Sequence, residues 1–143
     1  IEFMPLDAEH GWSLDRVVPA REILERVHAV FPLAAQPRVR AGHVEPAERF
    51  EYADGRGDVG VIASVTEPFC GDCDRVRVTA DGRLRTCLFA LDEHDLRALL
   101  RGGADDDAMA AAIERAVGAK WAGHRVGNVD FIRPDRSMSQ IGG

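Results

Sequence analysis

The sequence predicts an α/β protein in which one βα segment is followed by an α+β region with antiparallel strands. A short, largely apolar run over residues 1–5 precedes a helical pattern over residues 19–31. Short strand-like runs separated by glycines follow, and helical patterns return after residue 89. A strand, a loop and a helix form the repeating unit of βα-barrels and doubly wound sheets. We therefore expect two domains, residues 1–35 and residues 36–143.

The first segment is expected to contain a buried strand and a helix. Residues 1–5 form the strand, which Pro5 ends. Pro19 suits the first turn of the helix, and Pro32 is a plausible end for it. The apolar residues at helical spacing in between are Ile23, Leu24, Val27 and Phe31.

The second segment is expected to contain strands, a hairpin and two helices. Residues 59–65 are expected to form a central strand, and residues 75–79 and 84–87 the arms of a hairpin that turns at Asp81 and Gly82. Two helices are expected after residue 89, and each is ended by a glycine. The first has an apolar face of Leu96, Leu99 and Leu100 and ends at Gly102. The second has an apolar face of Met109, Ile113, Ala116 and Val117 and ends at Gly118.

Composition and charge exclude several classes of protein. Apolar residues make up 45% of the 143 residues, as in a globular protein. The sequence contains no run of 18 apolar residues, which is about the length needed to span a membrane. The first residues do not resemble a signal peptide, so we expect a cytoplasmic location. The net charge of −6 argues against DNA or long RNA as a partner. Because the sequence begins abruptly in an apolar run without Met, we expect a segment of a longer chain.

The three cysteines, Cys70, Cys73 and Cys87, are the strongest candidate for a chemical site. They follow the spacing C-x2-C-x13-C, and an odd, clustered count argues against a secreted disulfide framework. A 4Fe–4S cluster held by three cysteines would leave one iron open for a ligand. A zinc site needs a fourth ligand, for which His94 or His124 is available. Buried cysteines without metal and a thioredoxin-type redox pair are the remaining alternatives.

The geometry of the hairpin decides how Cys87 returns toward the other cysteines. With a loop of Asp81 and Gly82 alone, Cys87 lies opposite Val76 and points away from Arg75 and Arg77. A loop of residues 80–82 instead places Cys87 opposite Arg75, on the face shared with Arg77. We favour the second register, because a left-handed conformation is strained for Ala80 and free of strain for Gly82.

Arginines crowd this hairpin at positions 75, 77, 83 and 85. Guanidinium groups bind phosphates and carboxylates through two hydrogen bonds. The simplest interpretation is a solvated hairpin face. Beside an open metal centre, however, Arg75 and Arg77 become candidates to hold an anionic substrate, and Asp72 and Asp74 are close enough in sequence to pair with them.

Residues 69–89, with the sequence FCGDCDRVRVTADGRLRTCLF, closely resemble the C-terminal cluster motif of the GTP 3′,8-cyclase family. These are radical S-adenosylmethionine enzymes of molybdenum cofactor biosynthesis. The resemblance extends to the ending MSQIGG at residues 138–143 and to IEFMP at residues 1–5. It covers essentially the whole chain in order, and a motif of this length is far more specific than a lone C-x-x-C.

The resemblance implies a fold and a reaction. Residues 1–35 would be the last segment of an incomplete TIM-type barrel, and residues 36–143 a domain that binds a 4Fe–4S cluster and GTP. The family is a lyase family that converts GTP to 3′,8-cyclo-7,8-dihydro-GTP with S-adenosylmethionine as the radical source. The resemblance further implies GTP and the downstream cyclic pyranopterin monophosphate synthase as partners, and we also expect a homodimer.

The family motif also assigns roles to individual residues. Cys70, Cys73 and Cys87 would hold the second cluster of the family, and Arg75, Val76 and Arg77 would line the GTP. Met4 would border the S-adenosylmethionine site. Gly142 and Gly143 would extend toward the active site, where a chain without side chains can approach closely.

The sequence departs from the family in two ways. The C-x3-C-x2-C motif of the first cluster is absent, together with the earlier barrel strands. Asp74 stands where the family usually has asparagine. We therefore expect this chain by itself to be catalytically inactive, and the helix after residue 19 to be poorly anchored because residues 1–3 lack a neighbouring strand.

Overall fold

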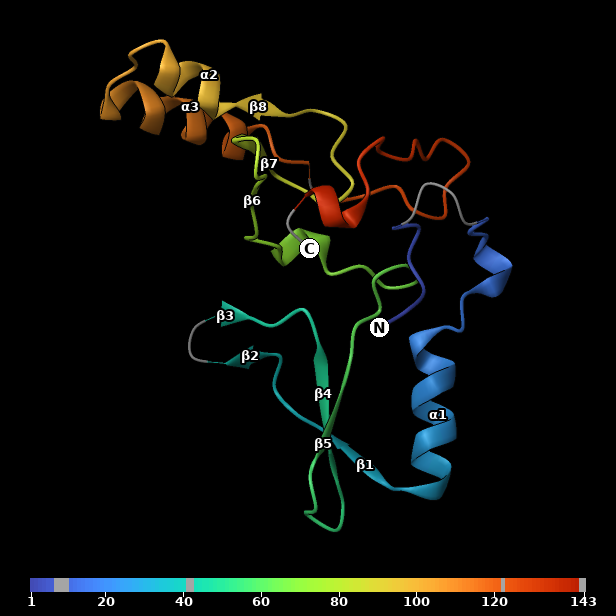
Figure 1. Ribbon diagram of the computed structural model, residues 1–143. Coiled ribbons are helices and arrows are strands. Elements are labelled where there is room, and N and C mark those ends of the chain that lie inside the picture. The colour runs from blue at the N-terminus through green and yellow to red at the C-terminus, as the bar shows by residue number, and fades with distance from the viewer. Residues whose placement is uncertain (7–10, 41–42, 122, 142–143) are drawn as a thin grey trace. The chain divides into compact units, whose positions relative to one another are not determined.

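The computed structural model describes residues 1–6, 11–40, 43–121 and 123–141 (Figure 1). The chain divides into two compact units, each described here by itself. The first unit comprises residues 1–4 and 11–73, and the second comprises residues 5–10 and 74–143. These units are defined by packing, so the predicted domain boundary after residue 35 stays a prediction.

The first unit combines one helix with small antiparallel sheets (Figure 1). Strand β4 is central in a sheet of order β1-β4-β5, and β2 and β3 form a separate ribbon. The elements are η1 (Leu14–Arg16), α1 (Ala20–Val30), β1 (Leu33–Ala35), β2 (Val39–Arg40), β3 (His43–Val44), β4 (Glu48–Tyr52), β5 (Asp58–Val61) and η2 (Cys70–Asp72).

Three expectations for this unit need correction. Residues 1–5 form no strand: Glu2 N–H donates to the carbonyl of Ile62 at 3.1 Å, but Ile1 and Phe3 are exposed. The strand expected over residues 59–65 ends at Val61 and lies at the edge of its sheet. The central position belongs to β4, which pairs with β1 on one side and β5 on the other.

The second unit contains a three-stranded antiparallel sheet of order β6-β7-β8 and two helices that lie side by side (Figure 1). Its core is formed by Leu84, Leu96, Ala112 and Ala116. The elements are β6 (Arg77–Val78), β7 (Arg83–Arg85), β8 (His94–Asp95), α2 (Leu96–Arg101), α3 (Asp106–Gly118) and η3 (Met138–Gln140). The mixed α/β architecture with antiparallel sheets is therefore confirmed.

Local signals in the sequence explain where the helices begin and end. The N-caps of α2 and α3 are Asp95 and Asp105, whose carboxylates accept from backbone N–H groups at 2.7 and 2.9 Å. Helix α2 ends before Gly102 and α3 ends at Gly118, as predicted. Helix α1 begins directly after Pro19, as expected from its sequence. Within the described residues, every helix is too short or too polar to cross a lipid bilayer.

Burial on the two later helices is narrower than their apolar patterns suggest. Only small or inward-facing residues are buried: Leu96, Ala112 and Ala116. The predicted apolar faces also contain residues that are substantially exposed, namely Leu99, Leu100, Ile113 and Val117. A three-stranded sheet covers only one side of a helix pair, which leaves part of each apolar stripe uncovered.

Candidate functional site

The hairpin adopts the predicted register. Arg77 lies opposite Arg85 and Val78 lies opposite Leu84. Thr79 N–H donates to the Arg83 carbonyl at 2.9 Å, which leaves residues 80–82 as the loop. Gly82 has φ of +78°, the left-handed conformation that the predicted three-residue loop requires. The pairing stops at Arg77 and Arg85, so both arms are shorter than the predicted residues 75–79 and 84–87: residues 75 and 76 precede β6, and residues 86 and 87 form a bend after β7.

The cysteines are half-buried, and they are distributed over both units. In the first unit, Cys70 and Cys73 belong to one 3-10 turn, in which Cys73 N–H donates to the Cys70 carbonyl at 3.3 Å. In the second unit, the Cys87 sulfur accepts a hydrogen bond from Phe89 N–H at 3.4 Å. Across the described residues, no three His, Cys, Asp or Glu side chains are grouped so that they could hold a metal ion.

The loop that leads to Cys70 is held by the carboxylate of Glu2, which is 3% exposed. One oxygen accepts from Ala20 N–H at the start of α1 and from the Thr66 hydroxyl, at 2.8 and 2.6 Å. The other accepts from the N–H groups of Val65 and Thr66, at 2.7 and 2.8 Å. The first turn of α1 is therefore anchored, contrary to our expectation, by a residue whose role the sequence analysis missed.

The hydrogen bonds to Glu2 outweigh the cost of burying it. Burial alone raises the pKa of a carboxyl group, since it disfavours the charged form. The Thr66 hydroxyl and the N–H groups of Thr66, Ala20 and Val65 act in the opposite direction, and the net result is a pKa of Glu2 below its ordinary value of 4.5. The visible sequence signal was an acidic residue inside an otherwise apolar N-terminal run.

The predicted GTP and S-adenosylmethionine residues differ in environment. Arg75 and Val76 are exposed just before β6, and Arg77 is half-buried within it. The Lys120 ammonium donates to the Arg75 carbonyl at 2.8 Å, which ties this arm to the end of α3. Met4 is half-buried in the first unit. Gly142 and Gly143 lie outside the described residues.

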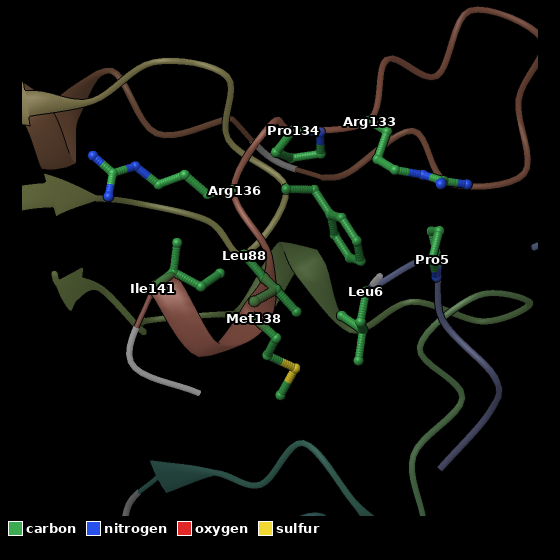
Figure 2. Close-up of a pocket in the computed structure, with 9 residues that line it drawn as sticks. Pro5, Leu6, Leu88, Arg133, Pro134, Arg136, Met138 and Ile141 are labelled. Carbon is green, nitrogen blue, oxygen red and sulfur yellow. The ribbon is translucent and has the colours of Figure 1, made fainter. Parts of the chain in front are cut away.

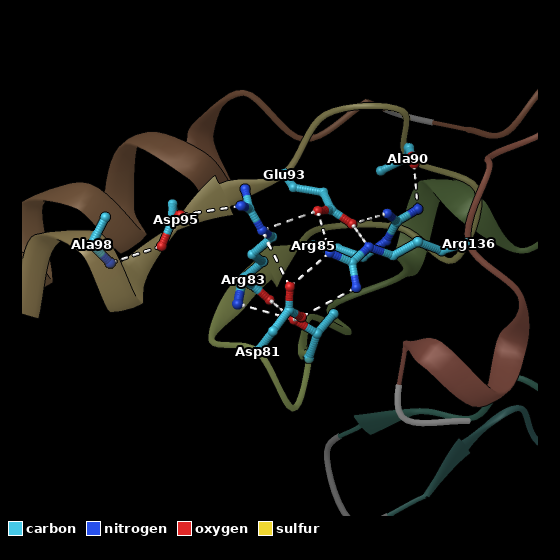
Figure 3. A network of polar contacts seen from close by, with 9 residues as sticks. Asp81, Arg83, Arg85, Ala90, Glu93, Asp95, Ala98 and Arg136 are labelled. Carbon is cyan, nitrogen blue, oxygen red and sulfur yellow. Dashed lines mark hydrogen bonds and ion pairs between the residues drawn. The ribbon is translucent and has the colours of Figure 1, made fainter.

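A network of ion pairs extends from the hairpin turn to the C-terminal segment (Figure 3). It joins three guanidinium groups to three carboxylates: Arg83, Arg85 and Arg136 with Asp81, Glu93 and Asp95. Arg136 donates to both oxygens of Asp81 at 3.1 and 2.8 Å, and its Nε lies 2.7 Å from Glu93. The network balances its charges, which favours burial of its centre.

Arg85 is the centre of this network and only 2% exposed. Its Nη1 lies 2.5 Å from Glu93 Oε1, and its Nη2 donates to the Ala90 carbonyl (Figure 3). A solvated face is therefore the wrong interpretation for Arg85. The reason is that Glu93 and the Ala90 carbonyl lie on the segment that returns beside β7, a contact that periodicity within the hairpin does not reveal.

The surroundings of Asp81 strongly favour its ionised form. Hydrogen bonds from Arg136, and then from the Thr79 hydroxyl at 2.6 Å, hold the pKa of Asp81 well below its ordinary value of 3.8. The same contact with Asp81 raises the pKa of Arg136. The sequence analysis treated Asp81 only as a turn residue, and nothing near position 136 signalled its partner.

An open cavity of about 340 Å³ in the second unit has Cys87 in its wall. His94 and His124, the two candidate zinc ligands, also line it. The His124 ring packs edge-on against Phe89, and its Nδ1 accepts from Val126 N–H at 3.3 Å. The remaining wall is largely apolar and includes Trp121. A cavity of this size, with a largely apolar wall and a few polar groups, suits a small ligand.

Comparison with known proteins places these features in one family. The model of the family described as Molybdenum Cofactor Synthesis C matches residues 1–126. A protein of Mycolicibacterium smegmatis named GTP 3′,8-cyclase is 50% identical over the whole chain, which corresponds to 40% of that protein. A GTP 3′,8-cyclase of Paenarthrobacter nicotinovorans is 47% identical, with 44% of it covered. GTP 3′,8-cyclase 2 of Mycobacterium tuberculosis is 50% identical, with 40% covered.

The chain thus spans less than half the length of the curated relatives it matches. The matching part is the C-terminal region of those relatives. With the cysteine spacing, the hairpin register and a family model matched over most of the chain, the assignment is direct: this chain belongs to the Molybdenum Cofactor Synthesis C family.

Proposed function

We propose that this chain is the substrate-binding region of a GTP 3′,8-cyclase, a lyase of the radical S-adenosylmethionine class. The observation that carries the proposal is the hairpin register, in which Arg77 lies opposite Arg85, two residues before Cys87. A thiol for a metal centre and arginines for an anion are thereby offered at the open end of one hairpin. Relatives named for this activity support it.

In this proposal Cys70, Cys73 and Cys87 hold a 4Fe–4S cluster. The donors suit such a group, because cysteine sulfurs are the usual ligands of these clusters and all three are partly accessible. The hydrogen bond from Phe89 N–H to the Cys87 sulfur is of the kind that stabilises a thiolate. When bound, the cluster would supply an open iron at which GTP is held.

The arginines of the hairpin are assigned different tasks. We assign Arg75 and Arg77 to the triphosphate, because guanidinium forks match phosphate oxygens. Val76 would contact the nucleotide between them. Arg83 and Arg85 are already committed to carboxylates of the protein, so their task is to keep β7 in place. Lys120 contributes by fixing the backbone of Arg75.

The remaining assignments depend on a chain of the full length of the relatives. Met4 would border S-adenosylmethionine, and Gly142 and Gly143 would extend into the active site. Residues 1–35 would complete the partial barrel. With only three cysteines, the present chain cannot hold two clusters, so we expect it to be inactive by itself. A homodimer, and transfer of the product to cyclic pyranopterin monophosphate synthase, complete the proposal.

Metal content after anaerobic reconstitution is the direct test of the cysteine site. The chain should take up about four iron and four sulfide ions and become brown. Cys87→Ala should lose this capacity, whereas Thr86→Ala, at the residue directly before it, should keep it. A colourless protein that binds one zinc ion would overturn the proposal in favour of a zinc-stabilised interaction module. His94→Ala and His124→Ala would then identify the fourth ligand.

GTP binding to the reconstituted chain tests the arginines separately. Arg75→Ala and Arg77→Ala should each weaken binding by about 1.5–3 kcal/mol, because each removes a charged hydrogen bond. Arg101→Ala, an exposed arginine at the end of α2, is the matched control and should bind GTP as the parent does. Unchanged affinity in the Arg75 and Arg77 variants would return these residues to a solvated face.

A further inference from the structure

The C-terminal segment is fastened to the cysteine-bearing hairpin by one side chain, Arg136. Its guanidinium spans two carboxylates, with both oxygens of Asp81 at 3.1 and 2.8 Å and the Glu93 oxygens at 2.7 and 3.1 Å. Asp81 sits in the turn of the hairpin, and Glu93 lies just before β8 (Figure 3). Because the contact is bidentate, it fixes the orientation of the segment as well as its distance.

The residues after Arg136 form a self-contained turn. Ser137 caps η3 through its side chain, and Gln140 reaches back to the Ser137 N–H at 2.8 Å. Ile141 is only 2% exposed, although it lies just beyond this turn.

Apolar contacts hold the turn in the second unit. Ile141 and Met138 face Leu88 and Leu6 across a space of only about 10 Å³, room for one water molecule at most (Figure 2). Leu88 directly follows Cys87 in the sequence. Arg136 and Ile141 therefore anchor the segment at both ends of η3, one by charge and the other by burial.

The anchor ends immediately before the terminal glycine pair. Ile141 is bonded directly to Gly142, so a displacement of Ile141 moves the point from which the glycines continue. Where reacting groups must be held closely, a shift of about 1 Å lowers a rate by about a hundredfold.

We propose that Arg136 is a positioning residue, which sets where Gly142 and Gly143 enter the active site by clamping the C-terminal segment to Asp81 and Glu93. The inference rests on the role given above to the terminal glycines. It adds a residue beyond the stretch that the family model matches, which ends at residue 126. In this role Arg136 acts only through the segment that it holds.

The test uses a chain of the full length of the cyclase relatives that ends in this sequence. Arg136→Ala, Arg136→Lys and Asp81→Asn are compared with Arg101→Ala as control. Three quantities are measured on each: hydrogen exchange of the Ile141 amide, which donates to the Met138 carbonyl at 3.2 Å, and kcat and KM for GTP. Iron content confirms that every variant compared holds the same metal.

Across the variants, faster hydrogen exchange at Ile141 should accompany a larger loss of kcat. In Arg136→Ala we expect kcat to fall about tenfold or more, while KM stays within about twofold of the parent value. Arg136→Lys should fall between, since it keeps the charge without the fork. If Arg136→Ala does not fold, the two milder variants decide. Faster exchange with unchanged kcat, unchanged exchange, or a loss confined to KM would each overturn the positioning role. Deleting residues 142–143 without loss of kcat would instead overturn the proposed role of the glycines.

Discussion

Glu2 in the first unit and Arg85 in the second are both almost completely buried, at 3% and 2% exposure, but they are stabilised in different ways. Glu2 receives four hydrogen bonds, three of them from backbone N–H groups. Arg85 interacts with Glu93, which Arg136 also contacts, so its environment depends on other charged side chains.

The difference has consequences for how each unit responds to substitution. Backbone donors remain in place when a side chain elsewhere is changed, so the environment of Glu2 is local and robust. The ion-pair network of the second unit shares its carboxylates among several arginines, so removal of one member leaves others unbalanced. We therefore expect Glu2 to behave as a single anchor and the network to respond as a group.

The two tryptophans allow the comparison to be measured, because Trp12 lies in the first unit and Trp121 in the second. Trp121→Phe leaves a reporter for the first unit, and Trp12→Phe leaves one for the second. Denaturant unfolding followed by fluorescence in these backgrounds gives a free energy of unfolding for each unit. Identical transitions in every variant would show that the units unfold together, and the comparison would fail.

The largest effect is expected from Arg85→Ala. It removes a buried partner of Glu93, whose own side chain is 16% exposed, and we expect a cost of about 3–5 kcal/mol of unfolding free energy in the second unit. The transition reported by Trp121 should shift accordingly, while that of Trp12 stays in place. Arg101→Ala, on the surface of the same unit, should change the free energy by less than about 0.5 kcal/mol. A loss as small as that control would show that Arg85 contributes little.

A smaller effect is expected from Glu2→Gln. The amide retains one oxygen acceptor and presents an NH2 group to the remaining backbone donors, so we expect a loss of about 2 kcal/mol from the first unit. The Trp12 transition measures it. Glu25→Gln changes an exposed residue of α1 and is the control. Equal stability of the two variants would contradict an anchoring role for Glu2.

The contribution of Glu2 should also depend on pH. Its pKa in the folded protein is lower than the ordinary 4.5, so ionised Glu2 stabilises the fold. That stabilisation is fully present above pH 4.5 and is lost as pH falls through the folded pKa. The difference in unfolding free energy between the parent and Glu2→Gln should therefore be constant from about pH 5 to 8 and narrow in acid. A constant difference down to pH 2 would contradict it.

The smallest expected effect is found in a comparison of two glycines with positive φ, Gly82 in the hairpin turn and Gly103 after α2. In Gly82→Ala the new Cβ would lie 2.7 Å from the Arg97 Cβ, and φ is +78°. Gly103→Ala has a similar φ of +84° and nothing within 4 Å of the new Cβ, so it isolates the backbone strain. We expect losses of about 1 kcal/mol at Gly103 and about 2 kcal/mol at Gly82, measured through Trp121. Equal losses would show that the contact with Arg97 relaxes freely.

Much of the fold could be predicted where the signals are local. The N-caps Asp95 and Asp105, the glycines after the helices and the left-handed Gly82 act within a few residues of their own position. The register of the hairpin follows from the last of these, and it was predicted correctly. The three cysteines were evident from spacing alone, and their role as cluster ligands stays a prediction.

What the sequence by itself determined about this protein is where its later helices end, its hairpin register and, through a long motif, its family. Only the tertiary structure revealed the anchor of α1 by Glu2, the edge position of β5, the burial of Arg85 and the clamp between Arg136 and Asp81. These join residues from 8 to 64 positions apart or depend on strand order. Periodicity and turn preference report only on near neighbours, whereas the pairing of buried charges depends on which distant segments the fold brings together.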